Sequence, residues 1–185
     1  MREPVARTIS AYQYLTETGK KPGDYLDFLV GERNRQVRRL CEKPDLDAAF
    51  AVLRDKMGFV GLTEKFDESL IIWKRWVGDP SLEIRYERIN VSSDRTLKRE
   101  IESNEEFMEK TKEATRLDQA LYQRVVEELY PAQQSAYGAS LESDVEAFQQ
   151  SLVGFRTQHG KSRLGDAKRN LLFRPCWQLA TKRGL

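Results

Sequence analysis

The chain has 185 residues, of which 39% are hydrophobic and 32% are charged, and its formal net charge is +2. This composition suits one folded domain with a highly charged surface. It excludes a membrane-spanning helix, because no apolar run approaches the roughly 20 residues that such a helix needs. With one histidine and two cysteines, Cys41 and Cys176, that have no metal-like spacing, we expect no metal site.

The first fourteen residues combine a turn, a helix start and side chains that suit an anion. Glu3 precedes Pro4, and the residue before a proline is displaced from the α region, whereas proline itself is favoured in the first helical turn. Arg2 lies where a strand would end, and Arg7 and Ser10 lie in the first turns of the predicted helix. Two guanidiniums, a hydroxyl and the positive end of a helix dipole predict a phosphate site. A surface helix with ordinary charges is the alternative.

Further along the chain, predicted helices alternate with predicted extended segments. Apolar residues recur with helical spacing in five stretches, about 25–30, 45–56, 64–77, 117–131 and 140–154. Segment 33–41 is a further helix or turn, in which Asn34 and Gln36 lie among several arginines that face either an anionic acceptor or water. Segment 82–91 alternates weakly and is expected to be an edge strand or an extended segment. Segment 92–99 is expected to be a loop, and 100–112 to be helical or mobile.

The apolar run Phe59-Val-Gly-Leu62 predicts a buried parallel strand, and Thr63 follows it at the start of the next helix. Ligands of nucleotide-binding α/β folds lie at the carboxyl ends of parallel strands, so Arg2 and Thr63 are expected at the same edge of a sheet. The alternative for Thr63 is a helix cap with no further role.

Charge is distributed unevenly along the chain. Residues 156–185 hold eight lysines and arginines and one acid, Asp166, whereas residues 1–155 hold 23 basic and 28 acidic residues. Such a basic tail attracts polyanions, or is simply a solvated, partly disordered end.

Several motifs together resemble a known family. Arg2-x-x-x-x-Arg7-x-x-Ser10-x-Tyr12 resembles the segment with which sulfotransferases bind the 3′-phosphate of 3′-phosphoadenosine-5′-phosphosulfate (PAPS). Segment 59–70 is similar to a strand–turn–helix of carbohydrate-type (family 2) sulfotransferases. Three further pieces follow in the family's order, and the resemblance covers about residues 1–130: Asn34-x-Gln36-x-x-x-Leu40, Asn90-Val91-Ser92 and Leu117-Asp118 with Leu121-Tyr122.

The resemblance implies a fold, a donor and a reaction. The fold is α/β, a partial P-loop-like sulfotransferase fold that is mostly helical here with one or two short parallel strands. Arg2 and Ser10 would hold the 3′-phosphate of PAPS or of its product PAP, Arg7 would support them, and Thr63 would lie near the adenine. A sulfuryl group would pass to a hydroxyl of a carbohydrate or similar acceptor.

In that family the 3′-phosphate motif is preceded by the phosphosulfate loop, its lysine and the catalytic base. We therefore expect residues 1–155 to be the C-terminal part of a sulfotransferase domain, and we expect this part to be inactive alone. The catalytic residues stay unassigned. No signal pattern is visible, which favours a cytoplasmic location. The alternative function is a non-catalytic helical module that binds an acidic partner through residues 156–185, without a specific nucleic acid.

Overall fold

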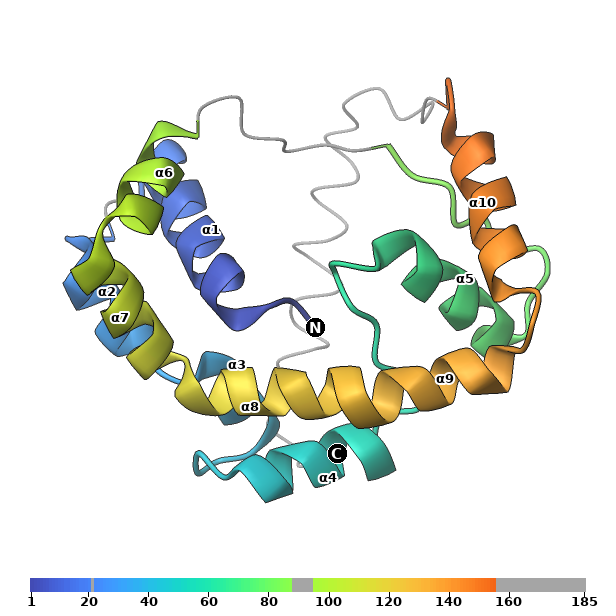
Figure 1. The fold of residues 1–185 in the computed structure, drawn as a ribbon, viewed down its shortest axis with the longest axis horizontal. Coiled ribbons are helices and arrows are strands. Elements are labelled where there is room, and N and C mark those ends of the chain that lie inside the picture. Colours follow the sequence, from blue (N-terminus) through green and yellow to red (C-terminus); the bar gives the residue numbers. More distant parts are fainter. Residues whose placement is uncertain (21, 88–94, 156–185) are drawn as a thin grey trace, which may run out of the picture.

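The computed structural model describes residues 1–20, 22–87 and 95–155, and in these ranges all regular secondary structure is helical (Figure 1). The elements in chain order are α1 (Pro4–Glu17), α2 (Tyr25–Glu32), α3 (Arg35–Leu40), α4 (Leu46–Asp55), α5 (Phe66–Val77), α6 (Thr96–Ser103), α7 (Glu105–Ala114), α8 (Arg116–Arg124), the π-helix η1 (Val125–Leu129), α9 (Tyr130–Tyr137) and α10 (Leu141–Leu152).

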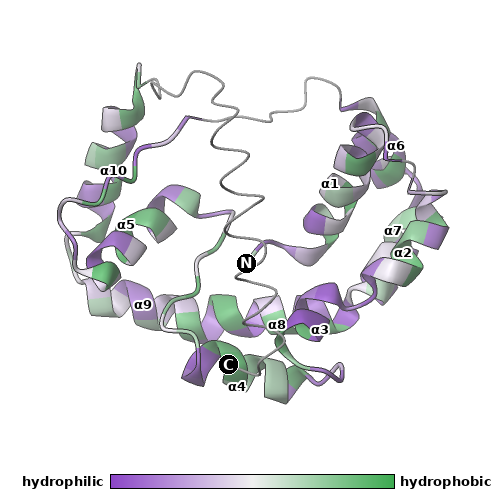
Figure 2. Cartoon of the chain, turned by 180° about the vertical axis from the view of Figure 1, so that it is seen from behind, coloured by the Kyte–Doolittle hydropathy of each residue, from purple (hydrophilic) through white to green (hydrophobic). Residues whose placement is uncertain are grey.

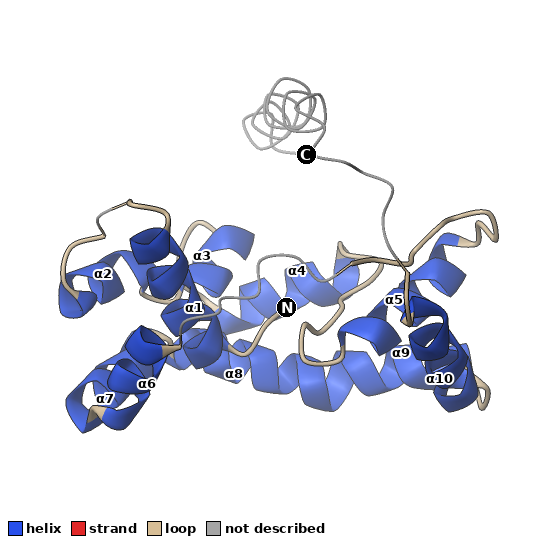
Figure 3. Ribbon diagram, turned by 90° about the horizontal axis from the view of Figure 1, so that it is seen from above, coloured by secondary structure: helices blue, strands red, loops and turns tan. Residues whose placement is uncertain are grey.

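The helices form an arch around the N-terminus. α8, η1 and α9 follow one another without a break along the base of the arch, α1, α2, α6 and α7 gather at one end, and α5 and α10 pack at the other (Figure 1). Seen from above, α3 and α4 lie on one side of this long helical base (Figure 3). Residues 1–3 therefore enter the space between the two ends of the arch.

The core has two parts, one along the base of the arch and against α5, and the other at the end formed by α1, α2, α6 and α7. A larger cluster joins α3, α4, α5, α8 and α9 around Phe50, Leu121 and Tyr130, and a smaller cluster joins α1, α2 and α6 around Ile9 and Ile101. Each helix carries both hydrophobic and hydrophilic residues, as amphipathic helices do (Figure 2). Burial of these apolar faces stabilises the arrangement, because isolated helices of this length are marginal in water.

The helix predicted to end near Pro131 instead continues to Tyr137. The π-helix η1, which precedes Pro131, explains this continuation. Proline has no N–H, so it cannot donate to the carbonyl of Glu127 four residues earlier. In η1 the N–H of Tyr130 donates to the carbonyl of Val125, five residues earlier, which shifts the hydrogen-bond pattern just before Pro131. Pro131 then lies in the first turn of α9, where proline is tolerated.

The predicted α/β fold with short parallel strands is wrong for the described residues, none of which forms a strand. Residues 59–62 belong to no regular element, and Val60 and Leu62 are buried as predicted. However, the N–H and C=O groups of Val60 and Leu62 bond to side chains, those of Gln133 and Ser69, rather than to a neighbouring strand. The apolar run therefore indicates that the segment is buried, but it does not distinguish a buried strand from a buried loop.

The helices predicted near the start, at 45–56, at 64–77 and at 140–154 are confirmed. The loop predicted at 92–99 is wrong from Thr96 onward, where α6 begins, and residues 92–94 lie outside the described ranges. Residues 82–87 form no strand, and the rest of that predicted edge strand also lies outside. Among the described residues, no helix is long and apolar enough to cross a membrane.

Candidate functional site

The two segments that carry Arg2 and Thr63 lie side by side. The amino group of Met1 donates to the carbonyl of Gly61, and the carbonyl of Met1 accepts from the Thr63 N–H at 2.7 Å and from the Thr63 hydroxyl at 3.0 Å. One residue further on, the Glu3 N–H donates to the carboxylate of Glu64 at 2.8 Å. Residues about 60 positions apart in the sequence are thus joined through their backbones.

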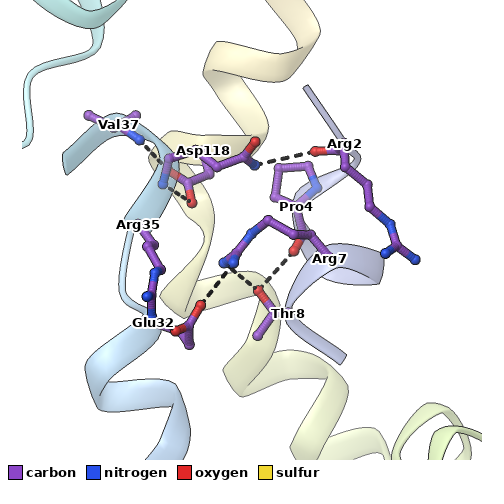
Figure 4. Close-up of polar contacts among 9 residues, drawn as sticks. Arg2, Pro4, Arg7, Thr8, Glu32, Arg35, Val37 and Asp118 are labelled. Carbon is purple, nitrogen blue, oxygen red and sulfur yellow. Dashed lines mark hydrogen bonds and ion pairs between the residues drawn. The ribbon is translucent and has the colours of Figure 1, made fainter. Parts of the chain in front are cut away.

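Arg2 is held by its backbone and leaves its side chain free. The Arg2 carbonyl accepts a hydrogen bond from Gln36 Nε2 at 3.3 Å, and its guanidinium points away from that of Arg7 (Figure 4). Within residues 1–20, 22–87 and 95–155, the Arg2 guanidinium makes no hydrogen bond and no ion pair, and the residue is half-buried. Arg2 is therefore a cation on an anchored backbone, without a counter-ion in this part of the chain.

Arg7 has acidic and hydroxyl partners instead. Its Nη1 lies 2.9 Å from the buried carboxylate of Glu32, and its Nη2 donates to Thr8 Oγ1 at 3.0 Å (Figure 4). Arg35 pairs with the same carboxylate. The structure therefore does not bring Arg7 together with Arg2, and the supporting role predicted for Arg7 stays a prediction.

Ser10 follows Arg7 by three residues and lies on the same face of α1. It is half-buried, and its hydroxyl bonds to none of the described residues. The first N–H groups of α1 are already occupied, because the Glu3 carboxylate accepts from Val5 N at 2.9 Å and from Ala6 N at 2.6 Å. An anion near Ser10 would thus depend on side chains and not on the helix end.

A mainly apolar cavity of about 410 Å³ lies beside Thr63. It is lined by side chains from residues 1, 59–63 and α5, among them Met1, Phe59, Leu62, Phe66 and Trp73. At Gly61 an added Cβ would lie 3.1 Å from both Phe59 and Ser69, so a larger residue here would require these side chains to shift. The cavity is large enough for a planar heterocycle.

Asn34 and Gln36 fix α3 against α8. The Asn34 side-chain oxygen accepts from the Leu117 N–H at 2.9 Å, and the buried Asp118 carboxylate accepts from Gln36 N at 3.0 Å and from Val37 N at 2.8 Å. Burial raises the pKa of Asp118, while these two N–H donors act in the opposite direction. The polar residues of this segment are therefore occupied in structural contacts, and through Gln36 they also hold Arg2.

Glu64 and Tyr122 were not predicted as partners. The Tyr122 hydroxyl donates to Glu64 at 2.9 Å, and burial together with this carboxylate raises the pKa of Tyr122 to about 12. Glu64 thus links the backbone of Glu3 to α8. Tyr122 belongs to the resembling motif near Leu121, but the sequence holds no signal that pairs it with a residue 58 positions earlier.

Comparison of the chain with models of protein families, with curated proteins and with solved structures finds no match. No group of histidine, cysteine, aspartate and glutamate that could hold a metal ion occurs in the described part of the chain. Asn90-Val91-Ser92, Cys176 and the basic tail 156–185 lie outside that part.

Proposed function

We propose that this protein binds PAPS and its product PAP in the manner of a sulfotransferase, with Arg2 and Ser10 on the 3′-phosphate and Thr63 near the adenine. The observation that carries the proposal is the pair of hydrogen bonds from Thr63 to the Met1 carbonyl. These bonds bring together the two segments on which the sequence resemblance rests, and no feature of local sequence requires that contact.

At the phosphate end, the Arg2 guanidinium supports the proposal because it has no counter-ion among the described residues. A guanidinium makes paired, charge-assisted hydrogen bonds to phosphate oxygens, which are stronger than bonds between neutral groups. The Ser10 hydroxyl adds a donor without a described partner. The helix dipole contributes little to the proposed site, because the Glu3 carboxylate occupies the first N–H groups of α1.

At the base end, the cavity beside Thr63 supports the proposal. Its apolar lining and its volume of about 410 Å³ fit a purine ring, whose faces gain from contact with aromatic side chains such as Phe66 and Trp73. Thr63 lies at its edge, next to the residue that precedes Arg2. In this proposal one nucleotide places its adenine in the cavity and its 3′-phosphate on Arg2 and Ser10.

The reaction that belongs to this proposal is transfer of a sulfuryl group from PAPS to a hydroxyl of a carbohydrate or similar acceptor. In this proposal Arg2, Ser10 and Thr63 bind the donor and do not take part in the chemical step. The base and the groups that would stabilise the leaving phosphate stay unassigned.

The proposal is tested by calorimetric titration of the full chain with PAP and with 5′-AMP, which lacks the 3′-phosphate. We expect PAP to bind more tightly than 5′-AMP. Arg2→Ala should weaken PAP binding by about 10- to 100-fold, since hydrogen bonds to charged groups contribute about 1.5–3 kcal/mol. The same variant should leave 5′-AMP binding almost unchanged. Arg33→Ala, at an exposed arginine outside the site, is the matched control.

Equal affinity for PAP and 5′-AMP, or no binding of either by a folded sample, contradicts the proposal. If PAP fails to bind while a polyanion binds and loses binding on deletion of residues 156–185, the chain is instead a helical module for an acidic partner.

A further inference from the structure

Trp76, near the end of α5, is unusually exposed for a tryptophan. Its side chain is 59% accessible, although tryptophans are among the most extensively buried residues on average. The neighbouring Trp73 faces the cavity beside Thr63, whereas Trp76 lines a different pocket of about 240 Å³. Phe59 lines both cavities.

Trp76 is exposed, and its ring packs closely against the backbone at Gly58. A methyl group added to Gly58 would overlap the six-membered ring of Trp76, so the indole rests directly on the backbone at that residue. The φ angle of Gly58 is not positive, so the glycine is required by this close approach and not by the backbone conformation. The contact therefore places one part of the indole against the backbone, while most of the ring remains accessible to solvent.

Three polar side chains of the pocket carry hydrogen-bonding groups beside this surface, and the rest of the lining, Phe59, Ile72 and Ala136, is apolar. The guanidinium of Arg75 lies 4.4 Å from the centre of the Tyr137 ring and makes no ion pair with a described residue. The Tyr137 hydroxyl donates to Asp144 at 2.8 Å and also interacts with the Arg75 side chain, and a phenolic oxygen can accept more than one hydrogen bond. Gln133 uses its amide to hold Val60 and completes the lining.

We infer that this pocket binds one pyranose ring of a carbohydrate. The C–H face of the sugar packs on the Trp76 indole, its ring hydroxyls accept from Arg75, and one hydroxyl donates to Tyr137. The volume of about 240 Å³ lies below the range for drug-sized ligands, so one ring enters and the rest of a longer saccharide stays outside. The inference concerns a pocket separate from the nucleotide cavity and does not depend on PAP binding.

A proline-rich peptide is the other ligand that packs on exposed aromatic rings, but the pocket suits it less well. Such peptides dock in grooves lined by several aromatic rings, each of which receives a proline. Here the face of Tyr137 is already covered by Arg75 and Phe59 is half-buried, which leaves Trp76 as the strongly exposed ring of the three. One apolar platform with a polar rim matches a ring that has C–H groups on its face and hydroxyls on its edge.

The test is titration of the full chain with cellobiose, lactose and diacetylchitobiose, followed by calorimetry and by acrylamide quenching of tryptophan fluorescence. At least one disaccharide should bind and protect tryptophan fluorescence from acrylamide. Trp76→Ala should weaken that binding by at least about tenfold, because the aromatic contact is lost. Gly58→Ala should weaken it comparably, although Trp76 is still present, because the added methyl displaces the ring.

Two variants serve as controls. Gly31→Ala places a methyl in open space on α2, and Val77→Ala removes an exposed apolar side chain next to Trp76, so both should bind the disaccharide as the natural chain does. The inference is overturned if no disaccharide binds, or if Trp76→Ala and Gly58→Ala bind the disaccharide as tightly as the natural chain does. It is also overturned if a proline-rich decapeptide, and none of the disaccharides, binds in a way that depends on Trp76. The quenching measurement uses the natural chain, so it tests disaccharide binding even if a substitution impairs folding.

Discussion

The carboxylate of Asp118 accepts the backbone N–H of Val37 at 2.8 Å, across 81 positions of the sequence. It also accepts the N–H of Gln36, so one buried side chain of α8 satisfies the first turn of α3 in place of a local cap. Gln36 in turn holds the carbonyl of Arg2. Asp118 therefore stabilises the packing of α3 on α8 and, through Gln36, also positions the backbone of Arg2, the residue proposed to bind phosphate.

Asp118→Asn should destabilise the protein. The amide can offer its oxygen to one N–H, but its NH₂ group would then face the other donor, which leaves a buried polar group unsatisfied. We expect the free energy of unfolding at neutral pH to fall by about 1–3 kcal/mol, measured by urea denaturation. Glu142→Gln, which changes an exposed carboxylate in the same way, should have almost no effect. Equal effects of the two substitutions would mean that the Asp118 hydrogen bonds contribute nothing.

Asp118 should also give the stability a specific pH dependence. Burial raises its folded-state pKa above the ordinary value of 3.8, so the folded state holds this proton more tightly than the unfolded chain does. The pH-dependent part of its contribution is therefore complete below the unfolded pKa and is lost as the pH rises through the folded pKa, whereas the hydrogen bonds from Gln36 and Val37 remain above it. The difference in unfolding free energy between the natural chain and Asp118→Asn should decrease as the pH rises from about 3.8 through that raised value. An increase would show that the N–H donors outweigh burial.

Ser69→Ala should disturb the segment before Thr63. The Ser69 hydroxyl accepts from the Leu62 N–H at 2.9 Å and lies 3.0 Å from the Tyr130 hydroxyl, and all of these groups are buried. Removal of the hydroxyl leaves the Leu62 N–H without a partner, so a loss of about 1–3 kcal/mol is expected in thermal or urea unfolding. Ser143→Ala, at an exposed serine, is the control. If the two variants unfold alike, the Ser69 hydroxyl does not hold this segment.

Glu32 should be among the most sensitive charged residues. Its buried carboxylate pairs with Arg7 Nη1 and with Arg35, and the buried Arg7 Nε has no hydrogen-bond partner among the described residues. Glu32→Gln should therefore lower the free energy of unfolding by about 1–3 kcal/mol, because the guanidiniums lose their counter-charge. A double-mutant cycle with Arg7→Met measures the coupling. A coupling energy of zero would mean that the ion pair contributes nothing to stability.

Thr63→Val should weaken PAP binding several-fold, whereas Thr63→Ser should bind almost normally. The Thr63 hydroxyl donates to the Met1 carbonyl, and loss of this bond, which contributes about 0.5–1.5 kcal/mol, loosens the residue next to Arg2. Calorimetric titration of both variants with PAP distinguishes the hydroxyl from the shape of the side chain. Unchanged affinity in Thr63→Val would remove this hydroxyl from the proposed site.

The helices were the predictable part of this protein, because each depends on residues close together in the sequence. Pro4 at the start of α1, Asp45 as the cap of α4 and the apolar stripe of α5 all identify their helices locally. The continuation of α8 through η1 into α9 could not be predicted, because Pro131 normally ends a helix and only the π-turn accommodates it. The fold class failed for a related reason, since the burial of residues 59–62 did not reveal that side chains satisfy their backbone.

The sequence alone determined which residues could serve a phosphate: Arg2, Arg7 and Ser10 are defined by type and spacing near a helix start. Only the tertiary structure decided their partners. The carboxylate of Glu32, from α2, engages Arg7, while Gln36 and the Thr63–Met1 contact hold the backbone around Arg2 and leave its guanidinium available. The physical reason is that an arginine's role depends on the nearest carboxylate in space, and packing of distant segments sets that distance.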